Sequence, residues 1–416
     1  MYMNVLINAF AIGPHVGSEP GIGWWWITHI AKHCKVFVIC GDEYRNEVDS
    51  ELNILPQKDN IVLNYNPIPQ KVIKMVRNQG DWRFYYYYRK WQKKAYQIAL
   101  KICSENQIDI IHQLNLTTYR EPGYLWKING PKYVWGPVGG MILCPIEYIK
   151  TIDSKTTWKY RIKNFLNNLQ IRIEPRVRKA ANHSDLVFFD SNTGVKNFDK
   201  NFGKKGIQIN ETGCVVRGTS NRLKVAGSGD CLDILWVGRF LPTKLLDLAF
   251  KTISKIDSQK KILLHILGTG ELEGKYKEIA REYGVEDRLK WYGQVSHDEV
   301  EQIMRSSDLF FFTSVVEGTP SVIMECISNG LPILCFDTCG FGPIVDETIG
   351  IKINLSNPER SASEFAEKIN LLYDHRELLK DMSNNCALKI NSISWDALID
   401  RLLDNYKGLL TNKSNQ

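Results

Sequence analysis

The sequence lacks the patterns that usually mark a secreted, metal-binding or membrane-spanning chain. Its ten cysteines include no Cys-x2-Cys pair, which argues against a disulfide framework or a zinc site and favours a reducing compartment. No run approaches about 18 apolar residues, so we expect no membrane-spanning helix. Residues 1–11 are apolar, but they carry no basic leader and are too short for a signal peptide. These absences predict a cytoplasmic protein.

The excess of positive over negative charge is also modest. The formal net charge of +7 suits anionic small molecules or a membrane surface, and it is too small to indicate a nucleic-acid partner. Hydrophobic residues make up 44% of the chain and charged residues 24%, which is typical of a folded globular protein. The 416 residues exceed what one hydrophobic core usually serves, so we expect two domains.

Short apolar runs alternate with helix-length amphipathic stretches along the chain. This alternation predicts an α/β fold with parallel sheets covered by helices on both faces. Ligands of such sheets bind at the carboxyl ends of the strands, so the loops that follow strands are the candidate sites. The predicted strands lie at residues 4–10, 35–40, 61–65, 108–112, 132–135 and 184–190 in the first half, and at 232–237, 262–267, 289–292, 308–313 and 332–336 in the second.

The alternation breaks at residues 211–230, which are rich in glycine and have little periodicity. This composition is typical of an interdomain linker. We therefore predict an N-terminal domain at residues 1–212 and a second domain at 213–393. Residues 394–416 add a detached helical pattern that ends in a polar tail.

Two cations follow the first predicted strand of the second half. Val237-Gly238-Arg239 comes directly after that strand, and Lys244 lies five residues beyond Arg239. The glycine permits a tight turn, while arginine offers a planar fork of donors and lysine a point charge, a combination suited to a diphosphate. The alternative is a pair of solvated surface cations.

Gly268-Thr269-Gly270 follows the next predicted strand. The dinucleotide fingerprint Gly-x-Gly-x-x-Gly is absent, because Glu273 stands where the third glycine belongs. This argues against a nicotinamide dehydrogenase. We interpret the segment as a tight strand-to-helix turn near the ligand.

Two glutamates surround a predicted helix start after the strand at 308–313. Glu317 lies on the loop, the helix is expected to begin near Ser321, and Glu325 lies about one turn inside it. A helix N-terminus presents unpaired N–H groups and partial positive charge, which suits phosphate or sugar oxygens. Glu325 could accept two hydrogen bonds from a ribose diol, and Glu317 could reach a sugar hydroxyl. The alternative is that both glutamates only complement the helix dipole.

The first half has a glycine-rich run at residues 17–23, between the first strand and a helical pattern at 24–31. Its glycines would let the backbone approach a ligand and expose helix N–H groups; the alternative is a flexible turn. His112 ends the strand predicted at 108–112, the functional end of a parallel strand. A single histidine is also often structural, and this alternative stays open.

Two stretches combine basic residues with an apolar stripe at helical spacing. Residues 71–101 carry nine Lys or Arg against one Asp, and residues 155–179 carry eight against one Glu. One interpretation is that both stripes pack on the sheet and the charges face solvent. The other is a peripheral membrane surface. The stripes contain Phe84, Tyr88, Trp91, Ala95, Ile98 and Ile102, and Trp158, Ile162, Phe165, Leu169, Ile173 and Val177.

The motifs at residues 237–244, 268–270, 291–293 and 317–325 together resemble the nucleotide-binding half of family-four retaining glycosyltransferases. Their GT-B fold has two Rossmann-like domains with a deep cleft between them. The resemblance covers roughly residues 232–373, and the runs at 17–24 and 136–140 resemble one subgroup. It implies that the helix in 394–416 crosses back to the N-terminal domain.

The resemblance also implies roles for individual residues. Arg239 and Lys244 would bind the donor diphosphate, Glu325 the ribose and Glu317 the donor sugar, while His112 would lie near that sugar. His112, Glu317, Arg239 and Lys244 would therefore be the catalytic residues. The implied donor-binding residues are Gly17, Ser18, Gly21, Gly238, Arg239, Lys244, Gly268, Gly270, Gly318, Thr319, Pro320, Ser321, Val322 and Glu325.

Two positions depart from the family pattern. Leu245 stands where a glycine often follows the lysine, and Thr319 stands where an aromatic residue is common. The second departure leaves the shape of the sugar pocket open.

The implied activity is transfer of a sugar, with retention, from a nucleoside diphosphate sugar to a saccharide or polyprenyl-linked saccharide. UDP is the expected base, with GDP as the alternative, and cell-surface polysaccharide synthesis is the expected setting. No Asp-x-Asp motif is present, so we expect no metal and no cofactor beyond the donor. An epimerase or phosphorylase of the same fold, or a non-catalytic nucleotide-sugar-binding protein, are the alternatives.

Overall fold

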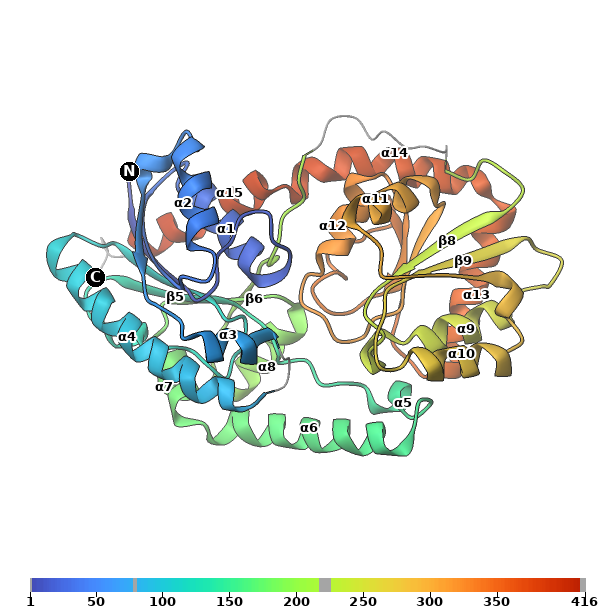
Figure 1. The fold of residues 1–416 in the computed structure, drawn as a ribbon, viewed down its shortest axis with the longest axis horizontal. Coiled ribbons are helices and arrows are strands. Elements are labelled where there is room, and N and C mark those ends of the chain that lie inside the picture. Colours follow the sequence, from blue (N-terminus) through green and yellow to red (C-terminus); the bar gives the residue numbers. More distant parts are fainter. Residues whose placement is uncertain (1, 78–80, 217–225, 412–416) are drawn as a thin grey trace. The chain divides into compact units, whose positions relative to one another are not determined.

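The computed structural model describes residues 2–77, 81–216 and 226–411, and it groups the chain into two compact units (Figure 1). Each unit has its own parallel sheet with apolar cores on both faces, which confirms the predicted α/β fold with two Rossmann-like domains. Unit 1 comprises Met1–Met141, Leu169–Glu211 and Trp395–Gln416, and unit 2 comprises Ile142–Asn168 and Thr212–Ser394.

Within the described residues, unit 1 is built on a seven-stranded sheet in the order β3-β2-β1-β4-β5-β6-β7. Its strand pairs are parallel, and Val5 in β1 lies in register between Val36 in β2 and Ile110 in β4. The chain order reverses between β1 and β4, which is where ligands usually bind in such sheets. The strands are β1 (Asn4–Ala9), β2 (Lys35–Cys40), β3 (Ile61–Tyr65), β4 (Ile110–Asn115), β5 (Lys132–Val138), β6 (Leu186–Phe189) and β7 (Ile207–Gln208).

Helices cover both faces of this sheet. On one face, α1 and α15 pack together, and Trp26 and Tyr406 are fully buried there. On the other face, α4 contributes Tyr88 and Trp91. The helices are α1 (Ser18–Ile30), α2 (Arg45–Ile54), α3 (Gln70–Arg77), α4 (Arg83–Glu105), α7 (Pro175–His183), α8 (Asn192–Phe202) and α15 (Trp395–Thr411), with 3-10 turns η1 (Lys58–Asn60) and η2 (Leu125–Lys127).

Unit 2 repeats this plan on a sheet in the order β10-β9-β8-β11-β12-β13. Consecutive strand residues point into two separate cores: in β8, Leu235 lies in one core and Trp236 in the other. The strands are β8 (Leu232–Val237), β9 (Ile262–Leu267), β10 (Leu289–Gly293), β11 (Leu309–Phe312), β12 (Ile333–Phe336) and β13 (Gly350–Ile353). The helices are α5 (Ile146–Ile149), α9 (Leu246–Ser254), α10 (Glu273–Glu282), α11 (His297–Ser306), α12 (Ser321–Ser328), α13 (Pro358–Asp374) and α14 (Arg376–Ile393), with 3-10 turns η3 (Pro242–Lys244) and η4 (Glu286–Arg288).

The segment Ile142–Asn168 lies inside the predicted domain 1–212, yet it groups with unit 2. Tyr148 explains why. Its ring packs against Phe336, with 5.7 Å between ring centroids, and its hydroxyl accepts a hydrogen bond from the Ser356 amide at 3.0 Å. This tyrosine is buried in one of the cores of unit 2. Of the predicted linker at 211–230, residues 217–225 lie outside the described residues.

The two basic, apolar stripes have different surroundings. The stripe on α4 is largely buried in the core of unit 1, so the packing interpretation is confirmed there. Helix α6 (Ser154–Ile173) differs, since Trp158 is 63% exposed and Phe165 67% exposed. The packing interpretation is therefore wrong for the part of the second stripe on α6, because this helix turns its apolar face to solvent. Among the helices of the described segments, none is long and apolar enough to cross a membrane.

The sequence does not predict β7 or β13. Strand β7 has only two residues, and β13, Gly-Ile-Lys-Ile, lacks the continuous apolar run that marks the four-residue strands β6, β11 and β12. The strand predicted at 108–112 is β4, which begins at Ile110 and continues to Asn115. This shift changes the surroundings of His112.

Leu245 has a left-handed backbone, with φ 50° and ψ 48°, at the turn between η3 and α9. Glycine adopts this conformation without strain, which gives a physical reason for the glycine that the family pattern has here. The leucine side chain is fully buried in the core of unit 2. Burial of this side chain therefore opposes the backbone strain.

Leu245 gives a test of that balance. Leu245→Ala should lower the free energy of unfolding by about 2–5 kcal/mol, because it removes a buried side chain. Leu245→Gly should cost about 1 kcal/mol less than Leu245→Ala, because glycine relieves the strain. The nearby Leu248 is buried and lies within α9, so there glycine should be worse than alanine by about 1 kcal/mol. Denaturant unfolding of the four variants measures this, and the same order at both positions would contradict it.

Candidate functional site

Two loops at the carboxyl ends of β8 and β11 are joined in unit 2. The hydroxyl of Thr313 donates to the Lys244 carbonyl at 2.6 Å and accepts from Trp236 Nε1 at 3.0 Å. The amide of Val315 donates to the Thr243 carbonyl at 3.0 Å. These bonds hold the predicted lysine beside the loop that carries the predicted glutamate.

Lys244 and Glu317 form an ion pair through Nζ and Oε1. Their side chains are 17% and 18% exposed, so the pair is screened less than one on the surface. Ser314 Oγ also donates to Glu317 Oε1, at 2.7 Å. The structure thus brings together two residues predicted to bind the donor diphosphate and the donor sugar. Arg239 lies on the loop after β8 and is exposed.

Gly268 and Gly270 lie against the loop that contains Gly238. Gly268 has φ +138°, and a Cβ atom there would lie 1.9 Å from the Gly238 carbonyl oxygen. A Cβ on Gly270 would lie 2.9 Å from atoms of Phe240. Close packing of two loops therefore requires both glycines, in agreement with the predicted tight turn. Their contact with a ligand stays a prediction.

Helix α12 begins at Ser321, as expected from the sequence, with Pro320 as its N-cap. Ser321 is exposed, and Val322 and Glu325 are half-buried. The preceding Gly318 carbonyl accepts from the Gly340 amide at 3.1 Å, which fixes the start of this turn. Thr319, by contrast, is buried. The N-terminal amides of α12 and the Glu325 carboxylate thus lie within one turn of each other.

The glycine-rich run of unit 1 differs from the prediction. It is the first part of α1, which begins at Ser18, rather than a loop before a helix at 24–31. Gly17 is the N-cap, and a Cβ on Gly21 would lie 1.9 Å from the Val16 carbonyl oxygen. A Cβ on Gly23 would lie 2.5 Å from the Ala11 carbonyl oxygen. Gly21 and Gly23 therefore allow the helix to pack on its own preceding loop.

A cavity of about 180 Å³ lies at the start of this helix, at the carboxyl ends of β4 and β5. Its lining includes Ser18, Glu19, Asn115 and Thr117. Glu19 is half-buried and accepts a hydrogen bond from the Thr117 amide at 2.9 Å. Removal from water raises the pKa of Glu19, and that hydrogen bond partly offsets the rise. Glu19 is absent from the predicted site residues, although it lies inside the glycine-rich run.

His112 does not end its strand, so that prediction is wrong. It lies in the middle of β4 and is fully buried. Its Nε2 lies 2.6 Å from the Gly136 carbonyl oxygen, and its Nδ1 lies 2.5 Å from the Tyr406 hydroxyl. Burial lowers the pKa of His112 to about 4. Both ring nitrogens therefore have protein partners, which favours the structural alternative; the role near the donor sugar stays a prediction.

No group of three or more His, Cys, Asp and Glu side chains within residues 2–77, 81–216 and 226–411 is arranged to hold a metal ion.

Comparisons with known proteins bear on unit 2 above all. Residues 222–388 match the family described as glycosyl transferases group 1. A Methanocaldococcus jannaschii protein described as an uncharacterized glycosyltransferase is 26% identical over 221 residues, which cover 53% of this chain and 58% of that protein. The match therefore spans less than two thirds of that relative's length.

Solved structures share the fold of the whole chain. A lipopolysaccharide outer core galactosyltransferase, in its apo form, has a TM-score of 0.62 at 15% identity and covers 99% of this chain and 100% of its own. The Anabaena protein HepE in complex with UDP and glucose has a TM-score of 0.61 at 15% identity, with 98% and 100% covered. At 15% identity, the similarity to these structures shows the fold only, and that fold is GT-B.

Glu19 gives a pH-dependent test of the cavity in unit 1. The pKa of Glu19 in the folded protein lies above the ordinary value of 4.5. The free energy of unfolding therefore falls as the pH rises from 4.5 through the folded pKa, because the buried carboxyl must ionise. Glu19→Gln should therefore stabilise the protein relative to wild type at pH 7 and lose this advantage near pH 4. Glu47→Gln, on the exposed face of α2, is the control and should change little at either pH. Thermal melts across this range measure the difference, and a gain that is independent of pH would contradict the assignment.

Proposed function

We propose that this chain, whose residues 222–388 match the glycosyl transferases group 1 family, transfers a sugar from a nucleoside diphosphate sugar to a saccharide or lipid-linked saccharide. We further propose UDP as the base, retention at the anomeric carbon, and a reaction without a metal ion. HepE, which was solved with UDP and glucose, supports this choice of donor. The lipopolysaccharide galactosyltransferase of the same fold supports an acceptor in cell-surface polysaccharide synthesis.

One observation carries the proposal: the Lys244–Glu317 ion pair lies between the carboxyl ends of β8 and β11, on the loop that leads into α12. A donor diphosphate would compete for Lys244, which could exchange the Glu317 carboxylate for phosphate oxygens. Glu317 would then become available to a hydroxyl of the donor sugar. Arg239 and the first amides of α12 would add further hydrogen bonds to the phosphates.

The proposed reaction follows from these charges. As the bond between the anomeric carbon and the diphosphate breaks, negative charge grows on the distal phosphate, and Lys244 and Arg239 stabilise it. The acceptor hydroxyl bonds to the anomeric carbon from the same face, and its proton passes to the leaving phosphate. The products are the glycosylated acceptor and the nucleoside diphosphate.

Substitutions in the ion pair test this assignment. Lys244→Ala and Arg239→Ala should each slow transfer by on the order of 30- to 1,000-fold, because each removes a contact worth roughly 2–4 kcal/mol in the transition state. Glu317→Gln should also slow transfer but bind UDP more tightly, because Lys244 no longer has to leave a carboxylate.

Calorimetry with UDP and kinetics with UDP-sugar and acceptor give the two readouts. Lys277→Ala, which removes an exposed lysine of α10, is the control and should behave as wild type. Weaker UDP binding in Glu317→Gln would contradict the exchange. Nucleotide release that does not depend on acceptor would favour an epimerase or hydrolase of the same fold, and binding without turnover would favour a nucleotide-sugar-binding protein.

The exposed stripe of α6 supports a further part of the proposal, peripheral contact with the cytoplasmic face of a membrane. Helix α6 carries five Lys or Arg and no acidic residue, beside the exposed Trp158 and Phe165. Exposed apolar rings flanked by cations suit the interface of an anionic leaflet. Each cation there contributes about 1 kcal/mol, which salt screens within roughly 8–10 Å.

Liposome flotation tests the membrane contact. Wild type should float with anionic vesicles at low salt, and binding should fall as the salt concentration rises. Trp158→Glu with Phe165→Glu should abolish flotation. Substituting Lys90, Lys93 and Lys94 of α4 by Glu should weaken it less, because the stripe of α4 is buried. Equal loss in both variants would mean that net charge alone drives binding, and no flotation of wild type would favour a soluble acceptor.

A further inference from the structure

A second cavity of unit 1, of about 300 Å³, lies at the N-terminal turns of α4 and has no role in the mechanism above. It is lined by Trp82, Tyr85, Tyr86 and Arg89 of this region and by Tyr119 to Glu121 on the loop after β4. The same loop also lines the smaller cavity, through Asn115 and Thr117. Both cavities therefore lie at the carboxyl edge of this sheet, where ligands of parallel sheets bind.

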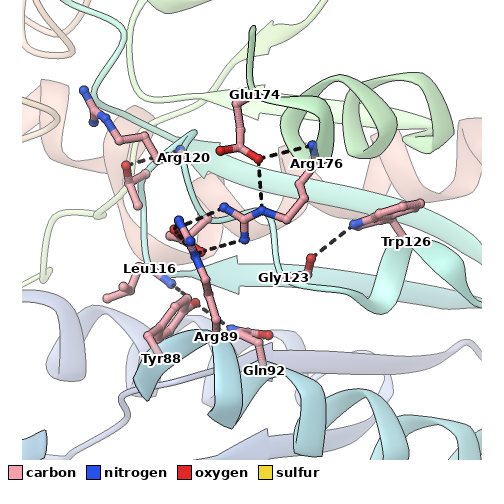
Figure 2. Close-up of polar contacts among 11 residues, drawn as sticks. Tyr88, Arg89, Gln92, Leu116, Arg120, Gly123, Trp126, Glu174 and Arg176 are labelled. Atoms are coloured by element: carbon pink, nitrogen blue, oxygen red, sulfur yellow. Dashed lines mark hydrogen bonds and ion pairs between the residues drawn. The ribbon is translucent and has the colours of Figure 1, made fainter. Parts of the chain in front are cut away.

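A buried carboxylate lines this cavity, and the side chains of Arg89 and Arg176 converge on it (Figure 2). Glu121 is only 2% exposed and accepts from Arg89 Nη2 at 2.7 Å and from Arg176 Nη1 at 3.2 Å. Arg176 Nε also donates to Glu174 at 3.0 Å. A buried charge is costly unless paired, so the two arginines are required here whatever ligand binds.

The cavity lining has two guanidinium groups, those of Arg89 and Arg120, and two carboxylates, those of Glu121 and Glu174. Arg176 lies outside the lining and pairs with both carboxylates, so this cluster of five side chains has one positive charge in excess. Arg120 Nε donates to Gln170 at 2.9 Å, and its guanidinium lies 4.5 Å from the centre of the Tyr119 ring. The side chain of Arg89 is 44% exposed although it is bonded to Glu121. A ligand in the cavity would meet guanidinium groups that are already oriented by the protein.

Exposed aromatic rings form another wall of the cavity. Trp82 is 78% exposed and Tyr86 57% exposed, although large aromatic side chains usually bury most of their surface. Neither ring belongs to the apolar clusters of unit 1. Lys90 Nζ lies over the Tyr86 ring, 4.5 Å from its centre, so Trp82 is the ring offered to a ligand. An exposed indole next to arginines suits a ligand that has both an apolar face and an anionic group.

The two walls are held in fixed positions by α4. Tyr88 is fully buried, and its hydroxyl accepts from the Leu116 amide at 3.2 Å and from Gln92 Nε2 at 2.6 Å (Figure 2). The helix that carries the aromatic wall therefore also fixes the start of the loop that carries Arg120 and Glu121. Preorganised groups of this kind lose little freedom when a ligand binds.

We propose that this cavity binds an acidic sugar unit of the acceptor, with the pyranose ring against Trp82 and a carboxylate or phosphate on Arg120 and Arg89. The inference rests on the proposed function, because it treats the ligand as the acceptor. Guanidinium groups favour planar carboxylates and phosphates over hydroxyl groups. A volume of about 300 Å³ is at the small end of ligand pockets, which limits the occupant to roughly one ring with its charged group.

Binding of small probes to the full chain tests the proposal without the need for the natural acceptor. Saturation-transfer NMR and titration would use methyl glucuronide, glucose 6-phosphate and methyl glucoside. We expect both acidic probes to bind at least about tenfold more tightly than the neutral one, and the tighter acidic probe distinguishes a carboxylate from a phosphate. Equal binding of all three, or no binding of either acidic probe, would overturn the proposal.

Variants then locate the site. Trp82→Ala should weaken all three probes by about tenfold or more, while Arg120→Gln should remove the preference for the acidic probes and leave the neutral one unchanged. Tyr2→Ala, which removes another exposed aromatic ring, is the matched control and should bind all probes as wild type. Trp82 is too exposed for its loss to unfold the chain, so wild-type probe binding in Trp82→Ala would overturn the site.

A parallel titration with UDP separates this inference from the proposed function. Normal UDP binding and transfer without binding of acidic probes would overturn only the acceptor site. Binding of acidic probes in a chain that neither binds UDP nor transfers sugar would overturn the proposed function and leave a site for acidic sugars.

Discussion

The parallel direction of the strands is the constraint on which the rest of this structure depends. Every described strand pair in both sheets is parallel, so within each unit the loops after the strands share one edge. In unit 2 this brings Lys244, which follows β8, to Glu317, which follows β11, although 73 residues separate them in the chain. In unit 1 it brings the start of α1 to the loop after β4.

Two ion pairs at these edges differ in how firmly they are held. Glu121 has two arginine partners and almost no exposure, so losing either arginine would leave a buried carboxylate with only one cationic partner. Glu317 has one lysine and one serine hydroxyl and remains partly exposed. The first pair suits a rigid floor for a ligand, and the second suits a contact that a ligand could replace. In the proposed reaction Lys244 leaves its carboxylate, whereas Arg89 stays paired with Glu121.

Helices α4 and α6 show what amphipathic spacing in a sequence predicts and what it does not. Both carry an apolar stripe with basic residues beside it, and the spacing predicts a helix in each case. The stripe of α4 is buried against the sheet of unit 1, whereas Trp158 and Phe165 of α6 face solvent. Periodicity fixes which side chains share a face, but it does not determine what that face contacts.

The amino-acid sequence by itself determined the strand–helix alternation, the helix start at Ser321 and the turns at Gly238 and Gly268, because these follow from local preferences and spacing. Only the tertiary structure decided contacts between distant segments. His112 lies in the middle of β4 and contacts Gly136 and Tyr406, which is on the last helix and 294 residues away; the predicted position of His112 at a strand end did not reveal these contacts. The pairing of Glu121 with Arg89 and Arg176 likewise depends on how α4, the loop after β4 and α7 pack, because the sequence does not indicate which charged residues folding brings together.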